Sequence, residues 1–502
     1  METSESQTTA RVSVRLLCST YGRLPEQFYA HVLPTPVCAP QWIAFNAKLS
    51  RDLGLGIELL SEAEQLALFA GNAIPEGVRP LAMAYAGHQF GNWVPQLGDG
   101  RAILLGEVRD VSDVCHDIQW KGGGRTPYSR GGDGRAALGP VMREYLVSEA
   151  MHALGVPTTR ALAAVLTGER VLRDKMLPGA VLVRVAASHV RVGTFQYFAA
   201  KQDIEGLKTL ADYVIERHYP FAAQTTNPYL TLLSQIVERQ AALIARWMSL
   251  GFIHGVMNTD NMTISGETID YGPCAFMDHY DPDKVFSSID SMGRYAFSHQ
   301  PKAAQWNLAR LAEALLPLIH PSEATAVELA TTVVADFMSQ YDNQWLLGMR
   351  SKLGLVTGQA GDGELVQALL DIMHGQNVDY TLAFRSLANS ASDETTLEPL
   401  QALFSAPAAI DAWVQQWRYR LTMDPMTPTA RCALMRQANP QVIPRNHQIA
   451  AAITAAEADL NFEPFNALHE ALARPYEERL DRAAYTRPPT ESERVRRTFC
   501  GT

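Results

Sequence analysis

The sequence contains no long apolar run, no long run of Lys or Arg, and no closely spaced pair of cysteines. No uninterrupted apolar stretch approaches the roughly 20 residues that span a bilayer. The opening segment, Met1–Thr9, is polar and lacks the charged-then-apolar order of a secretory signal. We therefore expect a soluble, cytoplasmic protein that does not act at a membrane.

The scarcity of basic runs bears on whether the protein binds nucleic acid. The chain carries 43 Lys and Arg against 53 Asp and Glu, a formal net charge of −10. An acidic balance of this kind argues against nucleic acid as the main partner, although it leaves room for a local basic cleft.

The cysteines are few and scattered. None forms a CxxC pair or shows metal-ligand spacing, so in an intracellular chain of this length they predict reduced thiols, not a disulfide framework. The exception is Cys500, which lies third from the end of the chain in a tail rich in Arg and Pro. The six are Cys18, Cys38, Cys115, Cys274, Cys432 and Cys500.

What the chain does have is length and apolar content. Its 502 residues are 47% hydrophobic, which excludes a disordered chain and is enough for a large core divided over more than one lobe. No internal repeat or low-complexity tract is visible, so we expect a compact fold with few linkers.

The first 200 residues are typical of short strands and Gly-rich turns. Strands are predicted at Ala102–Val108 and Ile118–Trp120, joined by a polar turn, and at Ala180–Ala186. A short amphipathic helix is predicted near Pro40–Leu53. A longer one is predicted at Pro140–Leu154, with Pro in its first turn and a Gly after its end.

Helices dominate after residue 200. The clearest is Pro228–Leu250, with Asn227 placed to cap it and Gly251 just past its end. From about residue 300 to 490 one amphipathic helix follows another. This order predicts an α+β fold with a strand-rich first lobe, a helical second lobe and a helical extension, and it places the candidate chemistry at the junction of the lobes.

Two Gly-rich segments could bind an anion. Gln96–Arg101 contains Gly98, Gly100 and Arg101 at the start of a strand, where backbone N–H groups and a guanidinium can approach phosphate oxygens. A strand follows, not a helix, so this is no Rossmann fingerprint, and a simple hairpin turn is the alternative. The second segment, Lys121–Arg135, is rich in Gly and Arg; its alternative is a surface loop with solvated arginines.

Three charged residues on predicted elements need partners. Glu144 shares the apolar stripe of its helix, so its carboxylate requires a cation. Lys121, at the end of the preceding strand, is the economical candidate, and such a Lys–Glu pair is how kinases hold phosphates. An ion pair with an arginine is the alternative. Arg184 lies on the strand face opposite Val181 and its neighbours, either as a surface residue or as a phosphate clamp.

The strongest pattern is Gly251–Asn261 followed by Ile269–Gly272. A long helix leads into a His-Gly turn, then Asp260 and Asn261, and finally Asp270 before an aromatic residue and a glycine. In kinase-like folds an Asn and a downstream Asp hold Mg²⁺ on the nucleotide phosphates. The position two residues after the His, where ordinary kinases place a catalytic Asp, is Val256. Simple phosphotransfer to a protein hydroxyl is therefore disfavoured.

These motifs resemble the selenoprotein O (SelO) family over essentially the whole chain. The segments that carry the resemblance are Met83–Gly91, Gln96–Arg101, Trp120–Arg135, His254–Asn261, Asp270–Asp278 and Thr498–Thr502. The resemblance implies a bilobal protein-kinase-like fold, described for this family as a pseudokinase. It also implies transfer of AMP from ATP to Ser, Thr or Tyr hydroxyls of proteins, with a related transfer of UMP from UTP.

The resemblance also implies roles for single residues. Asp260 would be the proton acceptor, Asn261 and Asp270 would hold Mg²⁺ or Mn²⁺, and Glu144 would pair with Lys121. Residues implied to contact ATP are Gly98, Gly100, Arg101, Lys121, Asp133, Gly134, Arg184, Arg191 and Asp270.

A redox role is implied for the tail. Family members carry selenocysteine or cysteine near the C-terminus, where this chain has Cys500, and in some members it bridges to a cysteine near the activation segment. Cys274 is the candidate partner here, and the alternative is that it is simply a small buried residue.

The expected domains are an N-terminal extension (1–80), a kinase-like N-lobe (81–200), a kinase-like C-lobe (201–330) and a helical extension with the cysteine-containing tail (331–502). We expect a monomer whose partners are ATP and hydroxyl-bearing proteins. Two other functions stay open from the residues alone. One is a conventional kinase-type phosphotransferase and the other a non-catalytic ATP-binding scaffold.

Overall fold

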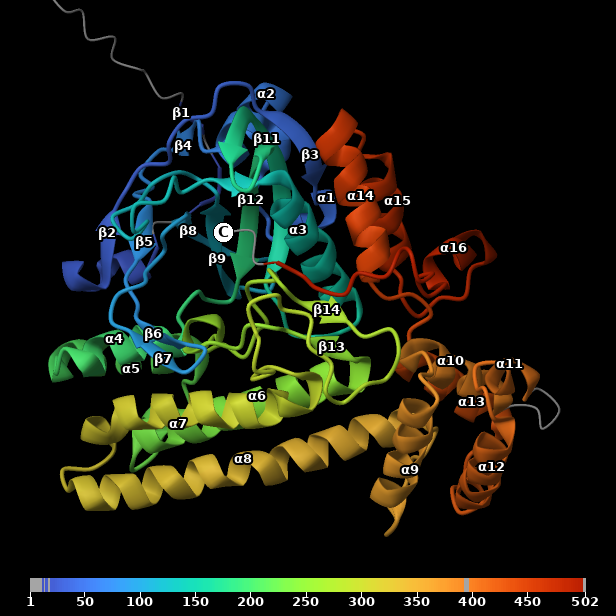
Figure 1. Cartoon of the computed structure of the whole chain (residues 1–502). Coiled ribbons are helices and arrows are strands. Elements are labelled where there is room, and N and C mark those ends of the chain that lie inside the picture. The colour runs from blue at the N-terminus through green and yellow to red at the C-terminus, as the bar shows by residue number, and fades with distance from the viewer. Residues whose placement is uncertain (1–10, 13, 17–18, 392–396, 500–502) are drawn as a thin grey trace, which may run out of the picture.

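The computed structural model describes residues 11–12, 14–16, 19–391 and 397–499. It is an α+β fold in which a β-rich N-terminal part is followed by a helical C-terminal part (Figure 1). Both the class of the fold and the order of its two parts agree with the sequence-based prediction.

The main sheet has eight strands within the described residues, and neighbouring strands are antiparallel. The predicted strands and their polar turn are confirmed as the β8–β9 hairpin and β12. The order across the sheet is β2 (Tyr29–His31), β5 (Leu81–Met83), β8 (Ala102–Arg109), β9 (Cys115–Lys121), β12 (Met176–Ala186), β11 (Arg160–Leu172) and β3 (Gln41–Phe45), with β10 (Ala136–Ala137) also paired to β12.

Each face of the sheet has its own core. Strand residues alternate between the two faces, so Val181 and Val183 pack with Trp120 into one cluster while Leu182 joins the other. The first cluster includes residues of α1 (Ala47–Asp52) and α2 (Glu62–Ala70), and the second includes α3 (Leu138–Ala153). Arg184 has the same parity as Leu182 and therefore faces α3.

The segment predicted as a helix near Pro40–Leu53 is a helix only in its second half. Gln41–Phe45 forms β3, which pairs with β11 at the edge of the sheet, and α1 begins at Ala47. Asn46 separates the two because its side chain accepts a hydrogen bond from the Leu49 N–H and caps the helix. Pairing with β11 therefore outweighs the local helical pattern.

The helix predicted at Pro228–Leu250 is confirmed as α6 with those bounds. The Asn227 side chain accepts from the Leu230 N–H, Pro228 occupies the first turn, and Gly251 ends the helix in the left-handed region at φ 73°. Around α6 lie α4 (Val192–Ala200), α5 (Ile204–His218), α7 (Gln300–Ile319) and α8 (Glu323–Lys352).

The helical extension continues to the end of the described chain. Its last long helices pack beside α3, and the chain then runs back toward the centre of the molecule (Figure 1). Among the described helices, none combines the length and apolarity needed to cross a membrane. They are α9 (Asp362–Gly375), α10 (Tyr380–Ser390), α11 (Glu398–Gln401), α12 (Pro407–Leu421), α13 (Pro428–Ala438), α14 (Asn446–Asp459), α15 (Glu463–Leu472) and α16 (Ala483–Thr486).

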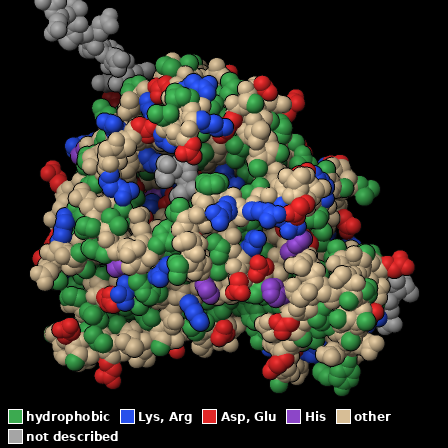
Figure 2. Space-filling view, viewed as in Figure 1, with side chains coloured by type: hydrophobic (Ala, Val, Ile, Leu, Met, Phe, Trp, Pro, Cys, Tyr) green, Lys and Arg blue, Asp and Glu red, His purple; other side chains and the backbone are tan. Residues whose placement is uncertain are grey.

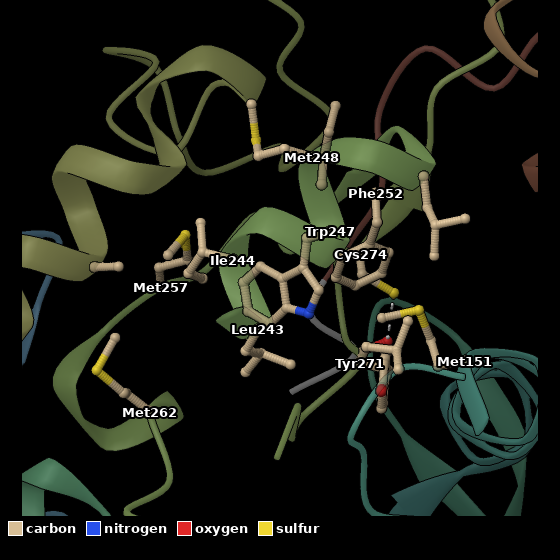
Figure 3. Close-up of a cluster of buried hydrophobic side chains, with 14 of the residues drawn as sticks. Met151, Leu243, Ile244, Trp247, Met248, Phe252, Met257, Met262, Tyr271 and Cys274 are labelled. Atoms are coloured by element: carbon tan, nitrogen blue, oxygen red, sulfur yellow. Dashed lines mark hydrogen bonds between the residues drawn. The ribbon is translucent and has the colours of Figure 1, made fainter. Parts of the chain in front are cut away.

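The loops after α6 rest on a buried apolar cluster (Figure 3). Trp247, near the end of α6, packs its indole on His254 with the ring centroids 5.4 Å apart, and its Nε1 donates to Thr268 Oγ1. Tyr271 contacts the ring of Phe252 from the other side of this cluster. The cluster thus supports both segments that the sequence singles out, 251–261 and 269–272.

Candidate active site

A lysine, a glutamate and an arginine meet between the sheet and α3. In the β9–β12 register Leu182 lies opposite Lys121, so Lys121 and Arg184 leave the sheet on the same face two positions apart. Glu144 projects from α3 between them. Its Oε2 lies 2.5 Å from Lys121 Nζ, and its Oε1 accepts from Arg184 Nη2 at 2.6 Å. Glu144 therefore pairs both with Lys121 and with an arginine, the two alternatives that the sequence left open.

Asp270 is the second anion of this cluster. Its Oδ1 accepts from Lys121 Nζ at 2.9 Å and from Arg184 Nη2 at 2.7 Å. Its Oδ2 accepts from Arg191 Nη1 at 3.1 Å. Burial alone would raise the pKa of Asp270, but Lys121, Arg184 and Arg191 together hold that pKa well below its usual value. The carboxylate is therefore ionised at neutral pH.

Asp270 also has an unusual backbone conformation, with φ at 63° in the left-handed region. Such a conformation is rare for a residue other than glycine and is found where the surrounding structure enforces it. The buried His254 supplies part of that enforcement, because its Nε2 donates to the Ile269 carbonyl at 2.8 Å. The His of the motif is thus a support for the Asp270 segment.

Asp260 is buried close to this cluster but keeps a partly unsatisfied carboxyl group. Its Oδ2 accepts from Gln89 Nε2 at 3.2 Å, and its backbone carbonyl accepts from Arg191. Its Oδ1 is buried without a hydrogen-bond partner among the described residues. Burial raises the pKa of Asp260 to about 6, against the lowering effect of Arg191 and Gln89. A carboxyl with this pKa and a free oxygen can accept a proton near neutral pH.

The residues implied to hold a metal offer oxygen ligands. Asn261 donates its Nδ2 to the Val256 carbonyl at 2.9 Å, which orients the amide and leaves its Oδ1 for another partner. Together with the carboxylate of Asp270, this is an oxygen set of the kind that Mg²⁺ or Mn²⁺ takes. Among the described residues no group of three or more His, Cys, Asp or Glu side chains could hold a metal ion. The donor set fits a metal that shares its coordination with a substrate and water.

The two Gly-rich segments are packed against each other. A Cβ on Gly98 would lie 2.4 Å from the Tyr128 ring, and one on Gly100 would lie 2.8 Å from the Tyr128 carbonyl oxygen. Thr126 Oγ1 also donates to the Asp99 carbonyl at 2.7 Å. The glycines are therefore required for the close approach of the two loops, and Arg101 follows at the start of β8.

Asp133 and Gly134 lie in the second loop with different partners. The Asp133 carboxylate accepts from both Arg173 Nη atoms, at 2.8 and 3.1 Å, and from the Arg135 N–H. These contacts join the loop to the β11–β12 turn, whereas Lys121, Arg184 and Arg191 each pair with Asp270. The structure therefore separates Asp133 from that cluster.

Gly134 gives a direct test of how this loop is held. We expect Gly134→Ala to destabilise the protein more than Gly131→Ala, because both positions have positive φ but only one is crowded. A Cβ on Gly134 would lie 2.1 Å from the Gly124 carbonyl oxygen, whereas one on Gly131 meets nothing within 4 Å. The left-handed conformation alone costs about 1–2 kcal/mol in either variant. Urea-unfolding midpoints measure the difference, and equal midpoints would contradict the packing described here.

Sequence reasoning passed over three residues beside Arg191 and Asp260. The Arg191 guanidinium lies over the Tyr85 ring, with Arg191 Cζ 4.7 Å from the centroid of that ring. Asp99, only 2% exposed, lies between Gly98 and Gly100 and has its Oδ1 4.0 Å from Arg191 Nη2. Gln89 binds Asp260 directly. Tyr85 and Gln89 belong to the Met83–Gly91 segment, which the resemblance had marked without a role.

The tail returns to the Asp270 segment. Thr498 is buried, its N–H donates to the Phe286 carbonyl at 2.7 Å, and its Oγ1 donates to the Pro273 carbonyl at 2.5 Å. Burial raises the pKa of the adjacent Cys274 thiol to about 11, which makes it a poor nucleophile in this conformation. Cys500 lies outside the described residues, so its pairing with Cys274 stays a prediction.

Figure 2 shows Lys and Arg side chains around a hollow in the upper half of this face. A buried set of cations with two carboxylates that are ionised at neutral pH, beside a carboxyl of raised pKa, is suited to binding and activating a polyphosphate. The site therefore has the groups that a phosphoryl- or nucleotidyl-transferring enzyme needs.

Comparison with known proteins gives the family. A family model described as "Protein adenylyltransferase SelO" matches residues 16–473. "Protein nucleotidyltransferase YdiU" of Agrobacterium fabrum (strain C58) is 59% identical, over 96% of this chain and 99% of that protein. Proteins of the same name from Rhizobium meliloti (strain 1021) and Bradyrhizobium sp. (strain ORS 278) are 58% and 57% identical, over 96% of this chain and 99% and 98% of theirs. The chain belongs to the SelO family of protein adenylyltransferases.

Proposed function

We propose that the protein transfers AMP from ATP to Ser, Thr or Tyr hydroxyls of proteins and releases pyrophosphate. One observation carries this proposal: a buried Asp260 with a pKa of about 6 and an unpartnered Oδ1 lies next to the cationic cluster around Asp270. The family and its nucleotidyltransferase members support the same reaction class. UMP transfer from UTP uses the same groups and is part of the proposal.

In this reaction Asp260 Oδ1 accepts the proton of the acceptor hydroxyl. The hydroxyl oxygen forms a bond to the α-phosphorus of ATP, the bond between that phosphorus and the pyrophosphate oxygen breaks, and pyrophosphate leaves. Lys121, Arg184 and Arg191 stabilise the negative charge that develops on the leaving group. Gln89 holds Asp260 through its Oδ2, which leaves Oδ1 to accept the proton.

Asn261 and Asp270 would hold Mg²⁺ or Mn²⁺, which supplies additional positive charge at the phosphates when bound. Gly98, Gly100, Arg101, Asp133 and Gly134 are proposed to contact ATP as well. For Asp133 this requires a change of partner, because Arg173 holds its carboxylate. Glu144 is proposed to keep Lys121 and Arg184 oriented whether or not nucleotide is bound.

We propose a bilobal, kinase-like arrangement with the site between its lobes. The N-lobe would be 81–200, the C-lobe 201–330, the N-terminal extension 1–80 and the C-terminal extension 331–502. The extension is integrated with the N-lobe, because β2 and β3 lie in the same sheet as β8, β9 and β12.

The kinase-type alternative lacks a base at the expected place. Val256, two residues after His254, is 4% exposed and apolar. Asp260 and Asp99 are both buried carboxyls of raised pKa beside the cluster, but of the two only Asp260 has a buried carboxylate oxygen without a hydrogen-bond partner among the described residues. A reaction at the α-phosphate would use Asp260 as the base, with no need for an Asp at position 256. The structure offers no observation that favours γ-phosphate transfer.

We propose that the protein acts in the cytoplasm, as a monomer, on protein acceptors and not on nucleic acid. The cysteines within the described residues, Cys38, Cys115, Cys274 and Cys432, are free thiols, which suits a reducing compartment.

Labelled ATP tests the reaction. With Mg²⁺ or Mn²⁺ and a protein acceptor, we expect label from the α-phosphate to become covalently attached to protein and label from the γ-phosphate to appear in pyrophosphate. Intact-mass measurement should show the mass of one AMP per modified hydroxyl. Protein labelled only from the γ-phosphate would overturn the proposal in favour of a kinase, and ATP binding without turnover would favour a scaffold.

A further inference from the structure

A pocket of about 240 Å³ lies beside the proposed base, on the far side of a small hairpin. The hairpin pairs β6 (Gly87–Gln89) with β7 (Asn92–Val94), and the other two walls come from α4 and α7. The volume is below the range of roughly 300–1,000 Å³ typical of small-molecule sites, so it suits one side chain better than a nucleotide. The lining residues are His88, Trp93, Gln196, Ala199, Ala200, Arg310, Glu313 and Ala314.

Gln196 lines this pocket and has a side-chain oxygen without a partner in the described part of the chain. Its side chain is 6% exposed, and its Nε2 donates to His88 Nδ1 at 2.9 Å. Its Oε1 is buried and has no hydrogen-bond partner among the described residues. A buried carbonyl oxygen in that state costs about 1–3 kcal/mol. A ligand with an N–H or O–H donor would recover this energy by drawing the Gln196 amide round to face the pocket.

The remaining walls favour a neutral, flat group. Burial lowers the pKa of His88, so its ring is neutral at pH 7, and the ring packs against Trp93 with centroids 4.9 Å apart. Trp93 is 39% exposed and presents an aromatic surface to a ligand. Arg310 and Glu313 form an ion pair of 2.6 Å, so each offsets the charge of the other at the rim.

The hairpin connects this pocket directly to the proposed base. The His88 N–H donates to Thr259 Oγ1 at 2.7 Å, while the next residue, Gln89, binds Asp260. Successive strand residues point to opposite faces, so Gln89 faces Asp260 and His88 faces the pocket. A segment of an acceptor protein whose hydroxyl reaches Asp260 can therefore pass along the edge of the hairpin and place a neighbouring side chain in the pocket.

We propose that this pocket binds a side chain of the acceptor protein that neighbours the modified hydroxyl, and that it selects a flat, uncharged side chain with a hydrogen-bond donor. Asn, Gln, Tyr and Trp have this chemistry, and their donor would bind Gln196 Oε1. The inference rests on the proposed function and adds to it a rule for choosing acceptors.

A peptide set tests the rule with α-labelled ATP. Each peptide carries one Ser acceptor in an Ala-Gly background and one neighbouring position occupied by Asn, Gln, Trp, Ala, Leu, Glu or Lys; Tyr is left out because its own hydroxyl is an acceptor. We expect the first three, at one fixed spacing from Ser, to be modified with about tenfold higher kcat/KM than the Ala peptide. No preference at any spacing would overturn the inference while leaving AMP transfer intact.

Variants locate the preference in the pocket. Ala199→Phe fills it, and Gln196→Met removes the carbonyl oxygen; both should abolish the preference while the affinity for ATP, measured by calorimetry without acceptor, keeps its wild-type value. Ala335→Phe, at an exposed position on α8, is the matched control and should keep the preference. Thermal unfolding monitored by circular dichroism verifies that each variant is folded.

The outcomes separate this inference from the function it rests on. A preference that survives in the folded Ala199→Phe and Gln196→Met variants would overturn the pocket assignment. A weakened affinity for ATP in both would mean that the pocket binds the nucleotide, which also overturns it. Absence of α-label in every peptide and protein acceptor, with wild-type enzyme, would overturn the proposed function and this inference together.

Discussion

Asp260→Asn should lower the rate of AMP transfer by about 10²- to 10⁴-fold while ATP still binds. The reason is that the amide cannot accept the hydroxyl proton, although its oxygen can still accept the hydrogen bond from Gln89. Lys121, Arg184 and Asp270 keep their mutual contacts in this variant because none of them bonds to the Asp260 side chain. Initial rates of label transfer from the α-phosphate, together with nucleotide titration by calorimetry, measure the two effects separately.

The matched control is Asp113→Asn, in an exposed turn after β8, which should change neither quantity. Full activity in Asp260→Asn would show that another group takes the proton. Loss of ATP binding in step with activity would instead assign Asp260 to nucleotide binding.

The pKa of Asp260 gives a pH dependence to both activity and stability. Since the carboxylate is the active form, the wild-type rate should rise with pH through about 6 and then level off. For stability the sign is opposite. The folded protein holds this proton more tightly than the unfolded chain, so the contribution of Asp260 favours folding at low pH and is lost as pH rises through about 6.

Asp260→Asn removes that titration. The free energy of unfolding of the variant, relative to wild type, should increase between pH 4 and pH 7 by about 2 kcal/mol, which is most of the effect of a pKa of 3.8 in the unfolded chain and about 6 in the folded protein. Urea-unfolding curves at several pH values measure it. A difference that does not change with pH would mean that Asp260 titrates normally in the folded protein.

Glu144→Ala should have the largest effect on stability, a loss of about 3–5 kcal/mol in the free energy of unfolding. Glu144 is 3% exposed, and its removal takes one of two anions away from the buried Arg184 and from Lys121. Asp270 is then left to balance three cations. ATP affinity should fall as well, because Lys121 and Arg184 lose the carboxylate that orients them.

Urea-unfolding midpoints at pH 7.5 measure the loss. Asp52→Ala is the control, since it breaks an exposed Lys48–Asp52 pair and should cost no more than about 1 kcal/mol. A Glu144→Ala protein as stable as wild type would show that the cluster contributes nothing net to folding, and nucleotide affinity would then be the informative readout.

Some of the candidate site could be predicted from local patterns. Alternation along the strand at Ala180–Ala186 indicates which face carries Arg184, and the apolar stripe of the helix predicted at Pro140–Leu154 places Glu144 toward a core. Both patterns are properties of a few neighbouring residues. They cannot name a partner, because Glu144 and Arg184 are 40 positions apart and meet only through the β9–β12 register and the packing of α3.

Local sequence patterns could not predict the raised pKa of Asp260 or its hydrogen bond to Gln89 either. They depend on the burial of the 259–261 turn beneath the β6–β7 hairpin, 171 positions away in the chain. The same holds for the segment near Pro40, where a helical pattern became strand β3 because the edge of β11 was available for pairing.

Local motifs were enough to indicate the family of this protein. The spaced Gly, Arg and Asp motifs resemble the SelO family, and the family model that matches residues 16–473 confirms it. Only the tertiary structure decided which charges meet, which glycines permit close packing, and which carboxyl is desolvated. These depend on contacts between segments distant in the chain, and burial is a property of the whole fold.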